Sequence, residues 1–274
     1  MNMPLLSVEE LDDLRTQDPL ILDCRFDLFK PDAGRQHYRE AHIPGAVYLH
    51  LNDDLSGPII PGTTGRHPLP DRQAFARRMA ELGLTAHRPV VAYDDKGGGI
   101  AARAWWLMLY LGHERVAVLD GGFPAWVAEG LPTESGYADI EAAEEAYPLA
   151  DAPFVNSCDL QTVEKIRSDD AYRLVDSRTP ERYRGEEEPI DPVAGHIEGA
   201  VNLPWPENLE NGKFKSKAAL RERFAGLKKE PQQNVFYCGS GVTACHNILA
   251  YYYAFGELPA LYPGSWSEYL LLLE

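Results

Sequence analysis

The residues best suited to chemistry lie in the segment FYCGSGVTACHN, residues 236–247. The apolar run NVFY stops at Cys238, and small residues separate this cysteine from a stretch that can begin a helix. Glycines in such a loop let successive N–H groups point inward, and a helix N-terminus adds positive potential, so a thiol there is stabilised as the nucleophilic thiolate. We therefore expect covalent chemistry centred on a strand-end loop. The predicted catalytic residues are Cys238, Gly239, Ser240, Gly241, Val242 and Thr243.

The chain contains one set of motifs twice, in the same order. The matching blocks are ILDCR (21–25) with LVDSR (174–178), AHIPGAVYL (41–49) with GHIEGAVNL (195–203), VVAYD (90–94) with NVFYC (234–238), and VLDGGFPAW (118–126) with LYPGSWSEY (261–269). Such a repeat indicates two duplicated domains of about 120–130 residues each. We expect an N-terminal domain over residues 1–132, a linker over 133–153 and a C-terminal domain over 154–274.

The two copies differ at the strand-end position itself. Cys238 in the second copy corresponds to Asp94 in the first, within YDDKGGGIAAR. A strand-end cysteine taken alone is more often a packing residue than a catalytic one. A carboxylate, however, is a poor substitute for a packing thiol, because burying a charge is costly. The pattern favours one working site in the second domain and a catalytically degenerate first domain.

Strand and helix patterns alternate in both copies. The runs PLILDCR, RPVVAYD, YRLVDSR and QNVFYC predict buried strands. SVEELDDLRTQ predicts a helix whose Ser7 and Glu10 form a capping box, and DRQAFARRMAELGL predicts a helix that stops at Gly83. This alternation indicates an α/β fold in which each domain is a mostly parallel sheet flanked by helices.

Composition and charge exclude several kinds of partner. The formal net charge is −16 at pH 7, and the basic residues are scattered along the chain, so we expect no nucleic-acid or membrane binding. The sequence has no run of 18 apolar residues, so no membrane span is predicted. The N-terminal residues do not resemble a signal peptide. The expected location is the cytoplasm, where thiols stay reduced. The four cysteines are too dispersed for a disulfide framework, and no motif predicts a metal site.

Taken together, the motifs resemble the rhodanese superfamily of sulfurtransferases in its two-domain form. CGSGVTAC is similar to the active-site loop of the 3-mercaptopyruvate sulfurtransferases, and AHIPGA, GHIEGA, LDGGFPAW and LYPGSWSEY resemble the flanking signatures, from about residue 5 to 270. The resemblance implies that Cys238 takes sulfur from a small-molecule donor as a persulfide. Cyanide, a thiol or a thioredoxin-like protein would then accept the sulfur, and no cofactor would be required.

The preferred donor depends on charge near the loop. Thiosulfate-preferring relatives carry Arg-Lys after the cysteine, whereas Gly239-Ser240 is neutral and favours the monoanion 3-mercaptopyruvate over the thiosulfate dianion. The resemblance implies that Arg182, in ERYRG, binds the anionic group of the donor. Mercaptopyruvate enzymes carry a second arginine in an EPR motif, where this chain reads EPID with Asp191. Thiosulfate-preferring transfer therefore stays open as an alternative.

The resemblance also implies that Ser240 works with a histidine and an aspartate. His67, in GRHPLP, matches the histidine, and the aspartate position falls on Asn52 with Asp53 beside it. The simpler interpretation of His67, and of Arg182, is that each is a surface residue. Residues that recur in both copies are expected to be structural, because only one copy has a nucleophile: Asp23, Arg25, His42, Asp176, Arg178 and His196.

Two other classes of function compete with this interpretation. A phosphatase with a C-x5-R loop needs an arginine six residues after the cysteine, and this chain has Ala244 there. The non-enzymatic alternative is a tandem binding or regulatory module in which Cys238 serves as a redox sensor. The intact glycine loop together with Arg182 favours an enzyme.

Overall fold

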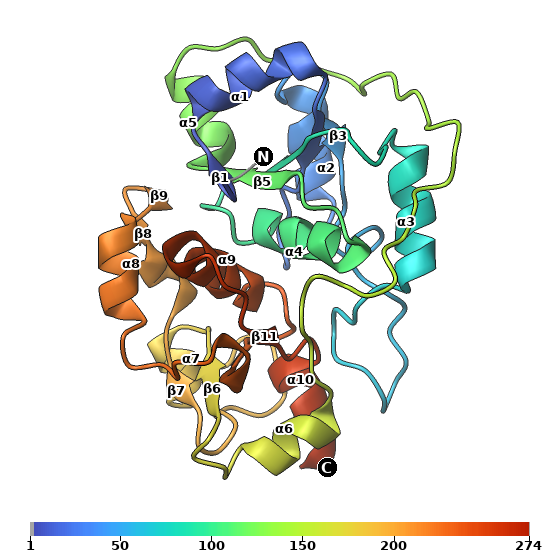
Figure 1. The fold of residues 1–274 in the computed structure, drawn as a ribbon. Coiled ribbons are helices and arrows are strands. Elements are labelled where there is room, and N and C mark those ends of the chain that lie inside the picture. Colours follow the sequence, from blue (N-terminus) through green and yellow to red (C-terminus); the bar gives the residue numbers. More distant parts are fainter. Residues whose placement is uncertain (1–2, 274) are drawn as a thin grey trace. The chain divides into compact units, whose positions relative to one another are not determined.

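The computed structural model describes residues 3–273, and the chain divides into two compact units. The first unit runs to Gly57 and resumes over Pro70–Phe154, whereas the second takes in Pro58–Leu69 and continues from Val155. Figure 1 follows the chain from blue at the N-terminus to red at the C-terminus. Because Pro58–Leu69 belongs to the second unit, His67 lies in the same unit as Cys238.

The first unit is built on a five-stranded parallel sheet with the strand order β1-β5-β4-β2-β3. Its strands are β1 (Leu5–Leu6), β2 (Leu20–Asp23), β3 (Val47–Tyr48), β4 (Val90–Tyr93) and β5 (Val116–Leu119). Its helices are α1 (Val8–Leu14), α2 (Ala33–Glu40), α3 (Arg72–Glu81), α4 (Ala101–Leu111) and α5 (Gly122–Ala128). Every residue of these strands is buried, as the apolar runs PLILDCR and RPVVAYD predict for β2 and β4.

The second unit repeats this plan with a four-stranded parallel sheet in the order β11-β10-β6-β7. Its strands are β6 (Arg173–Asp176), β7 (Val201–Asn202), β10 (Asn234–Tyr237) and β11 (Ala260–Leu261), and β8 (Leu209–Glu210) forms a hairpin with β9 (Lys213–Phe214). Its helices are α6 (Leu160–Ile166), α7 (Pro180–Tyr183), α8 (Lys217–Arg223), α9 (Ala244–Phe255) and α10 (Ser265–Tyr269). The predicted α/β fold with two similar domains is confirmed.

Local signals set the ends of two predicted helices. At the start of α1, the Glu10 carboxylate accepts a hydrogen bond from the N–H of Ser7 at 2.8 Å, and the Ser7 hydroxyl accepts one from the N–H of Glu10 at 3.1 Å. Helix α3 begins after Asp71, whose side chain accepts a hydrogen bond from the N–H of Ala74, and ends just before Gly83, which has a φ of +86°. The capping box and the glycine stop are therefore confirmed.

The segment expected to link the domains contacts the first unit along much of its length. Its N–H groups donate to first-unit carbonyls, as at Ala143 to Ala80 (2.8 Å), and Phe154, just beyond it, donates to Leu109 (3.2 Å). Tyr147 is buried, and its hydroxyl lies 3.0 Å from Nδ1 of a histidine in the same unit. The acidic residues of this segment therefore lie on a chain that is anchored by its backbone.

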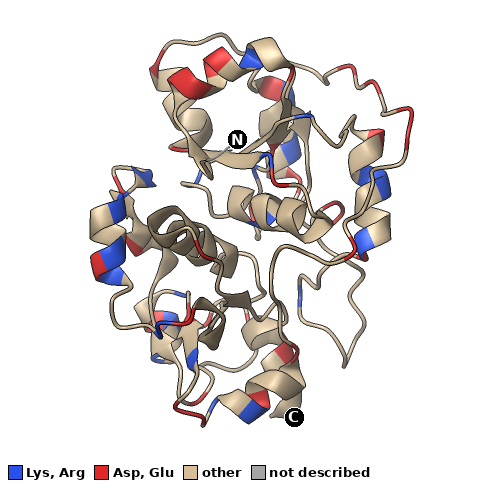
Figure 2. Cartoon of the chain, viewed as in Figure 1, with Lys and Arg blue, Asp and Glu red and all other residues tan. Residues whose placement is uncertain are grey.

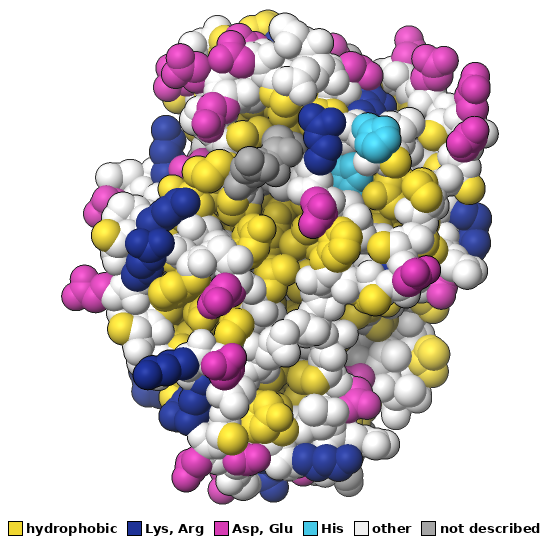
Figure 3. Space-filling model, in the orientation of Figure 1, with side chains coloured by type: hydrophobic (Ala, Val, Ile, Leu, Met, Phe, Trp, Pro, Cys, Tyr) yellow, Lys and Arg dark blue, Asp and Glu magenta, His cyan; other side chains and the backbone are white. Residues whose placement is uncertain are grey.

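Charged side chains of both signs are dispersed over each unit. Figure 2 shows basic and acidic residues together on α3 and on α8, and Figure 3 shows Lys and Arg among Asp and Glu on the face in view. Within residues 3–273, no helix has the length and apolar character needed to cross a membrane.

Candidate active site

Cys238 lies at the carboxyl end of β10, where the chain turns toward α9. Strand β10 pairs in parallel with β6 and β11, so this end lies at the sheet edge where α/β proteins place ligands. The turn depends on Gly241, which has a φ of +75° and leaves no room for a side chain because the backbone of Pro263 is in contact with it. The loop therefore buries Cys238, which is 2% exposed, inside a tight turn.

The surroundings of Cys238 stabilise its anionic form. Burial raises the pKa of the thiol, but hydrogen bonds from the Thr243 hydroxyl and from the N–H groups of Ser240 and Ala244 outweigh burial and hold the pKa below the usual value for cysteine. Cys158 shows the contrast, because burial, together with the charge of Asp159, raises its pKa to about 12. The loop thus gives Cys238 the character of a nucleophile.

The segment after β11 fixes the position of this loop. The Ser265 hydroxyl accepts a hydrogen bond from the N–H of Cys238 at 3.1 Å. Trp266 N–H donates to the Cys238 carbonyl at 3.0 Å, and Ser267 N–H donates to the Gly239 carbonyl at 2.9 Å. Both backbone groups of Cys238 are therefore paired, which fixes the backbone of this residue in the turn.

The remaining residues of the predicted loop lead into the helix. Val242 is buried, and its carbonyl accepts a hydrogen bond from the N–H of Cys245 at 3.1 Å. Thr243 occupies the N-cap position of α9, and its hydroxyl is directed toward the thiol rather than toward the helix backbone. The first turn of α9 thus places its N-terminal end beside Cys238.

The structure brings His67 and Ser240 together. Nδ1 of His67 lies 2.7 Å from Oγ of Ser240, and the side chains are held within the second unit. His67 is 5% exposed, so its interpretation as a surface loop residue is wrong. Asp53, the nearby candidate for a third member, belongs to the first unit, where its carboxylate lies 3.1 Å from Nδ1 of His50. A complete Ser–His–Asp relay stays a prediction.

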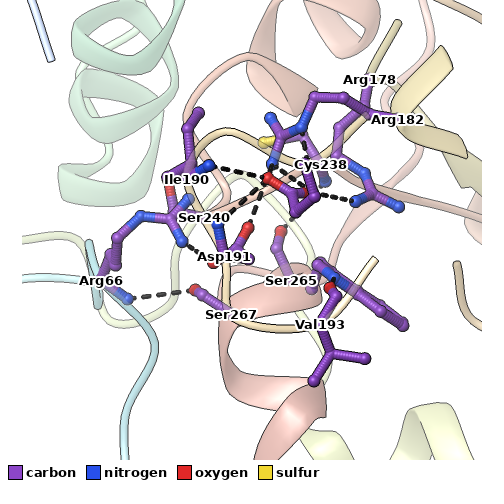
Figure 4. A network of polar contacts seen from close by, with 12 residues as sticks. Arg66, Arg178, Arg182, Ile190, Asp191, Val193, Cys238, Ser240, Ser265 and Ser267 are labelled. Atoms are coloured by element: carbon purple, nitrogen blue, oxygen red, sulfur yellow. Dashed lines mark hydrogen bonds and ion pairs between the residues drawn. The ribbon is translucent and has the colours of Figure 1, made fainter. Parts of the chain in front are cut away.

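Arg182 lies beside the loop and is largely buried, with 15% of its side chain exposed. Glu188 accepts hydrogen bonds from its Nε (3.1 Å) and its Nη2 (2.7 and 2.9 Å), and Asp191 accepts a further one from Nη2 at 3.0 Å. Figure 4 shows this network of arginines and carboxylates around Cys238. The interpretation of Arg182 as a solvated surface charge is therefore wrong. One edge of its guanidinium is already paired with carboxylates.

Arg66 is a site residue that the sequence reasoning missed. Its Nη1 forms an ion pair with Asp191, and a Cβ built on Gly239 would lie 3.0 Å from its Nη2. The same Cβ would lie 3.4 and 3.5 Å from the two Nη atoms of Arg182. The neutral Gly239-Ser240 pair is thus flanked by guanidinium groups from elsewhere in the second unit. The available signal was that Arg66 directly precedes His67 in GRHPLP.

The recurring Asp and Arg residues form equivalent buried ion pairs in the two units. Arg25 contacts both carboxylate oxygens of Asp23 at 2.6–3.0 Å, and Arg178 contacts those of Asp176 at 2.6–3.1 Å. Each guanidinium also donates to a backbone carbonyl, of Ala41 or Gly195, in its own unit. The prediction of a shared structural role for these pairs is confirmed.

The recurring histidines also occupy equivalent positions. Nδ1 of His42 lies 2.7 Å from the Tyr38 carbonyl, and Nδ1 of His196 lies 2.7 Å from the Tyr183 carbonyl. Each imidazole stacks on the ring of the same tyrosine, with centroids 4.0 and 3.9 Å apart. These contacts support the expectation that the two histidines shape turns.

Asp94 occupies the first-unit position that corresponds to Cys238. One carboxylate oxygen accepts hydrogen bonds from the N–H groups of Lys96 (2.9 Å) and Gly98 (2.8 Å). The other accepts from Ile100 (2.8 Å) and Ala101 (3.0 Å). The first unit therefore has a loop of inward N–H groups as well, but its own carboxylate fills it.

Among the described residues, no group of three or more His, Cys, Asp or Glu could hold a metal ion.

Comparison with known proteins identifies the class. The rhodanese-like domain family matches residues 7–129 and 159–271. A Pseudomonas aeruginosa protein named "Probable 3-mercaptopyruvate sulfurtransferase" is 44% identical over 266 residues, which is 94% of this chain and 91% of that protein. Thiosulfate sulfurtransferase of Rattus norvegicus is 35% identical over 247 residues, covering 86% of this chain and 79% of that protein. A solved 3-mercaptopyruvate sulfurtransferase from Leishmania major matches with a TM-score of 0.86 and 32% identity, over 99% of this chain and 75% of that one.

The chain therefore belongs to the rhodanese family, with two rhodanese-like domains, as its motifs predict. Its relatives transfer sulfur from 3-mercaptopyruvate or from thiosulfate, according to their names. Within the family this chain is a sulfurtransferase.

Proposed function

We propose that Cys238 carries the transferred sulfur as a persulfide and that 3-mercaptopyruvate is the preferred donor. The observation that supports the first part is the lowered pKa of a buried thiol, which receives hydrogen bonds from Thr243, Ser240 and Ala244. The thiolate is the form that attacks sulfur, and a lowered pKa increases the fraction of the cysteine in this form. Asp94 has no such reactivity, so one site serves the whole chain.

The proposed reaction has two steps that balance without a cofactor. The Cys238 thiolate attacks the donor sulfur, the S–S bond forms, and the C–S bond breaks with its electron pair moving to carbon as the enolate of pyruvate. The proton of the former donor thiol moves to this carbon, which leaves pyruvate and the persulfide anion. An acceptor thiol or cyanide then attacks the outer sulfur, and Cys238 leaves again as the thiolate. Inward N–H groups stabilise both anions of the cysteine.

The charge of the site supports a monoanionic donor. Three guanidinium groups, those of Arg66, Arg178 and Arg182, lie in one network with two carboxylates, Glu188 and Asp191. Asp176, which also pairs with Arg178, adds a third carboxylate behind the network. The carboxylates make the net charge of the network less positive than that of the arginines alone. This lower charge favours a donor with one negative charge over a donor with two.

The acceptor and the cellular location are part of the same proposal. A thiol, cyanide or a thioredoxin-like protein can discharge a persulfide by the second step above. A cytoplasmic location suits a thiolate nucleophile, because that compartment keeps cysteines reduced. The four cysteines of the chain are present as free thiols.

The deciding experiment compares two assays on the same preparation. Sulfide release from 3-mercaptopyruvate with a reductant is expected to exceed thiocyanate formation from thiosulfate and cyanide, in kcat/KM. The reverse order would make thiosulfate the donor. Absence of both activities, with Cys238 still forming a reversible mixed disulfide, would support the redox-sensor alternative.

A further inference from the structure

The guanidinium groups of Arg66 and Arg182 converge on the residue that follows the nucleophile. Arg66 Nη2 would lie 3.0 Å from a Cβ on Gly239, and the Arg182 Nη atoms would lie 3.4–3.5 Å from it. We propose that Arg66 is a donor-binding residue, which binds the carboxylate of the sulfur donor together with Arg182 beside Gly239. This inference rests on the proposed role of Cys238.

Arg66 is fixed to the loop through its backbone. Its N–H donates a hydrogen bond to the Ser267 hydroxyl at 3.1 Å, and the N–H of the same serine donates to the Gly239 carbonyl at 2.9 Å. The next residue, His67, contacts Ser240. The segment Pro58–Leu69 thus places two side chains against consecutive residues of the catalytic loop, one on Gly239 and one on Ser240.

Asp191 orients the two guanidinium groups. One of its carboxylate oxygens pairs with Nη1 of Arg66, and the other accepts from Nη2 of Arg182 at 3.0 Å. Glu188 takes the Nε and Nη2 edge of Arg182. Figure 4 shows Asp191 in this network with Arg66 and Arg182. Nη2 of Arg66 and both Nη atoms of Arg182 lie nearest to Gly239. Asp191 contacts one Nη atom of each arginine and so acts as a positioning residue.

The chemistry of this pair suits a carboxylate. Guanidinium groups are planar and present N–H donors in a fork that matches two carboxylate oxygens. Burial lowers the pKa of Arg66, the Cys238 charge raises it, and the neighbouring Arg182 charge lowers it again. A bound anion between the two arginines relieves this repulsion. Within the described residues, Nε of Arg66 is also buried without a hydrogen-bond partner.

Arg66 also accounts for a departure in the sequence. Where related mercaptopyruvate enzymes carry a second arginine in an EPR motif, this chain has EPID. The acidic residue at that point, Asp191, contacts Arg66 instead. The cation that EPID lacks is thus supplied by Arg66, from the segment that carries His67.

The test compares 3-mercaptopyruvate with mercaptoacetone, which has a methyl group in place of the carboxylate. Loss of one charged hydrogen-bonding partner is expected to lower kcat/KM for persulfide formation from mercaptopyruvate by about ten- to a hundredfold in Arg66→Ala, mainly through KM. The rate with mercaptoacetone should change little. Arg66→Lys should recover part of the loss. Asp191→Asn should raise KM in the wild type and have a smaller further effect in Arg66→Ala, where only its contact with Arg182 remains.

Arg184→Ala is the matched control, because this arginine lies in the same ERYRG motif but is half exposed and pairs with Glu186. It should leave both donors unaffected. An equal loss for both donors in Arg66→Ala and Arg66→Lys would overturn the inference. Pyruvate binding, followed by saturation-transfer NMR, provides a readout that needs no sulfur transfer. If the wild type forms no persulfide but binds pyruvate through Arg66, the proposed function fails, whereas carboxylate binding by Arg66 is retained. Pyruvate binding that is equal in wild type and Arg66→Ala refutes the inference.

Discussion

Nδ1 of His67 lies 2.7 Å from Oγ of Ser240, although 173 residues separate them in the chain. Both side chains are nearly buried, with 5% and 7% of their surface exposed. Ser240 also donates its N–H to the Cys238 thiolate. The same serine therefore connects the imidazole with the nucleophile, through its side chain on one side and its backbone on the other.

This contact predicts that His67 assists proton transfer or positions the serine hydroxyl during the donor step. His67→Ala is expected to lower kcat for 3-mercaptopyruvate by about a hundredfold, the lower range for a general acid or base. Ser240→Ala should give a similar loss. In the double variant the two losses should not multiply, because residues that act as one unit are strongly non-additive. Fully multiplicative losses would show that the contact has no part in the reaction.

A second prediction concerns the covalent intermediate. After treatment with a sulfur donor, intact-mass analysis should show a gain of one sulfur atom in the wild type and none in Cys238→Ser. Cys158→Ser is the control, because burial raises the pKa of Cys158 to about 12 and keeps it a thiol at neutral pH. It should gain sulfur as the wild type does. A mass gain that persists in Cys238→Ser but disappears in Cys158→Ser would show that Cys158 is the nucleophile.

The strands and helix ends could be predicted from the sequence, because their signals are local. The capping box of Ser7 and Glu10 and the stop at Gly83 each depend on residues within one turn of a helix. The strand-end loop around Cys238 could also be predicted, because the duplicated copy with Asp94 shows what is specific to Cys238.

The position of Arg66 could not be predicted in this way. Its contact with Asp191 joins residues 125 positions apart, and no local pattern distinguishes it from other arginines. The charge of the site depends on such long-range contacts. Gly239 and Ser240 by themselves form a neutral loop, whereas the folded chain places Arg66 and Arg182 against it. Residue type at the loop is therefore a poor guide to the potential that a donor meets.

The pKa of Cys238 leads to a third prediction. Thr243→Val removes one of the hydrogen bonds that lower this pKa, and a hydrogen bond to a charged group is worth about 1.5–3 kcal/mol, or about one to two pKa units. The midpoint of iodoacetamide alkylation against pH should rise by that amount. Thr179→Val is the control, since Thr179 makes no capping hydrogen bond at the start of α7. An unchanged midpoint in Thr243→Val would contradict the role of the hydroxyl.

The same shift has a consequence for stability. A cysteine whose folded pKa lies below its unfolded value stabilises the fold above the unfolded pKa, and this contribution disappears as the pH falls through the folded value. Thr243→Val should therefore destabilise the second unit more at alkaline pH than at mildly acidic pH. Urea unfolding at several pH values measures the difference, and a loss that is independent of pH would assign the effect to packing.

The last prediction concerns the degenerate loop of the first unit. The Asp94 carboxylate accepts four backbone N–H groups, which lie in Lys96, Gly98, Ile100 and Ala101. Asp94→Ala leaves these donors without their acceptor in a mostly buried turn, and unpaired buried donors cost about 1–3 kcal/mol each, less than additively within one network. We expect the free energy of unfolding of the first unit to fall by about 3–5 kcal/mol.

The loss in Asp94→Ala should be visible in urea unfolding and as faster hydrogen exchange over residues 95–101, while donor-dependent mass gain at Cys238 persists in the folded protein. Asp53→Ala provides a matched control, because this aspartate belongs to the same unit but has a side chain that is 65% exposed. It should change the stability by less than about 1 kcal/mol, since exposed ion pairs contribute little. If Asp94→Ala were no less stable than Asp53→Ala, the inward N–H groups would not need an anion. The loop around Cys238 would then have to owe its preference for a thiolate to something other than its backbone.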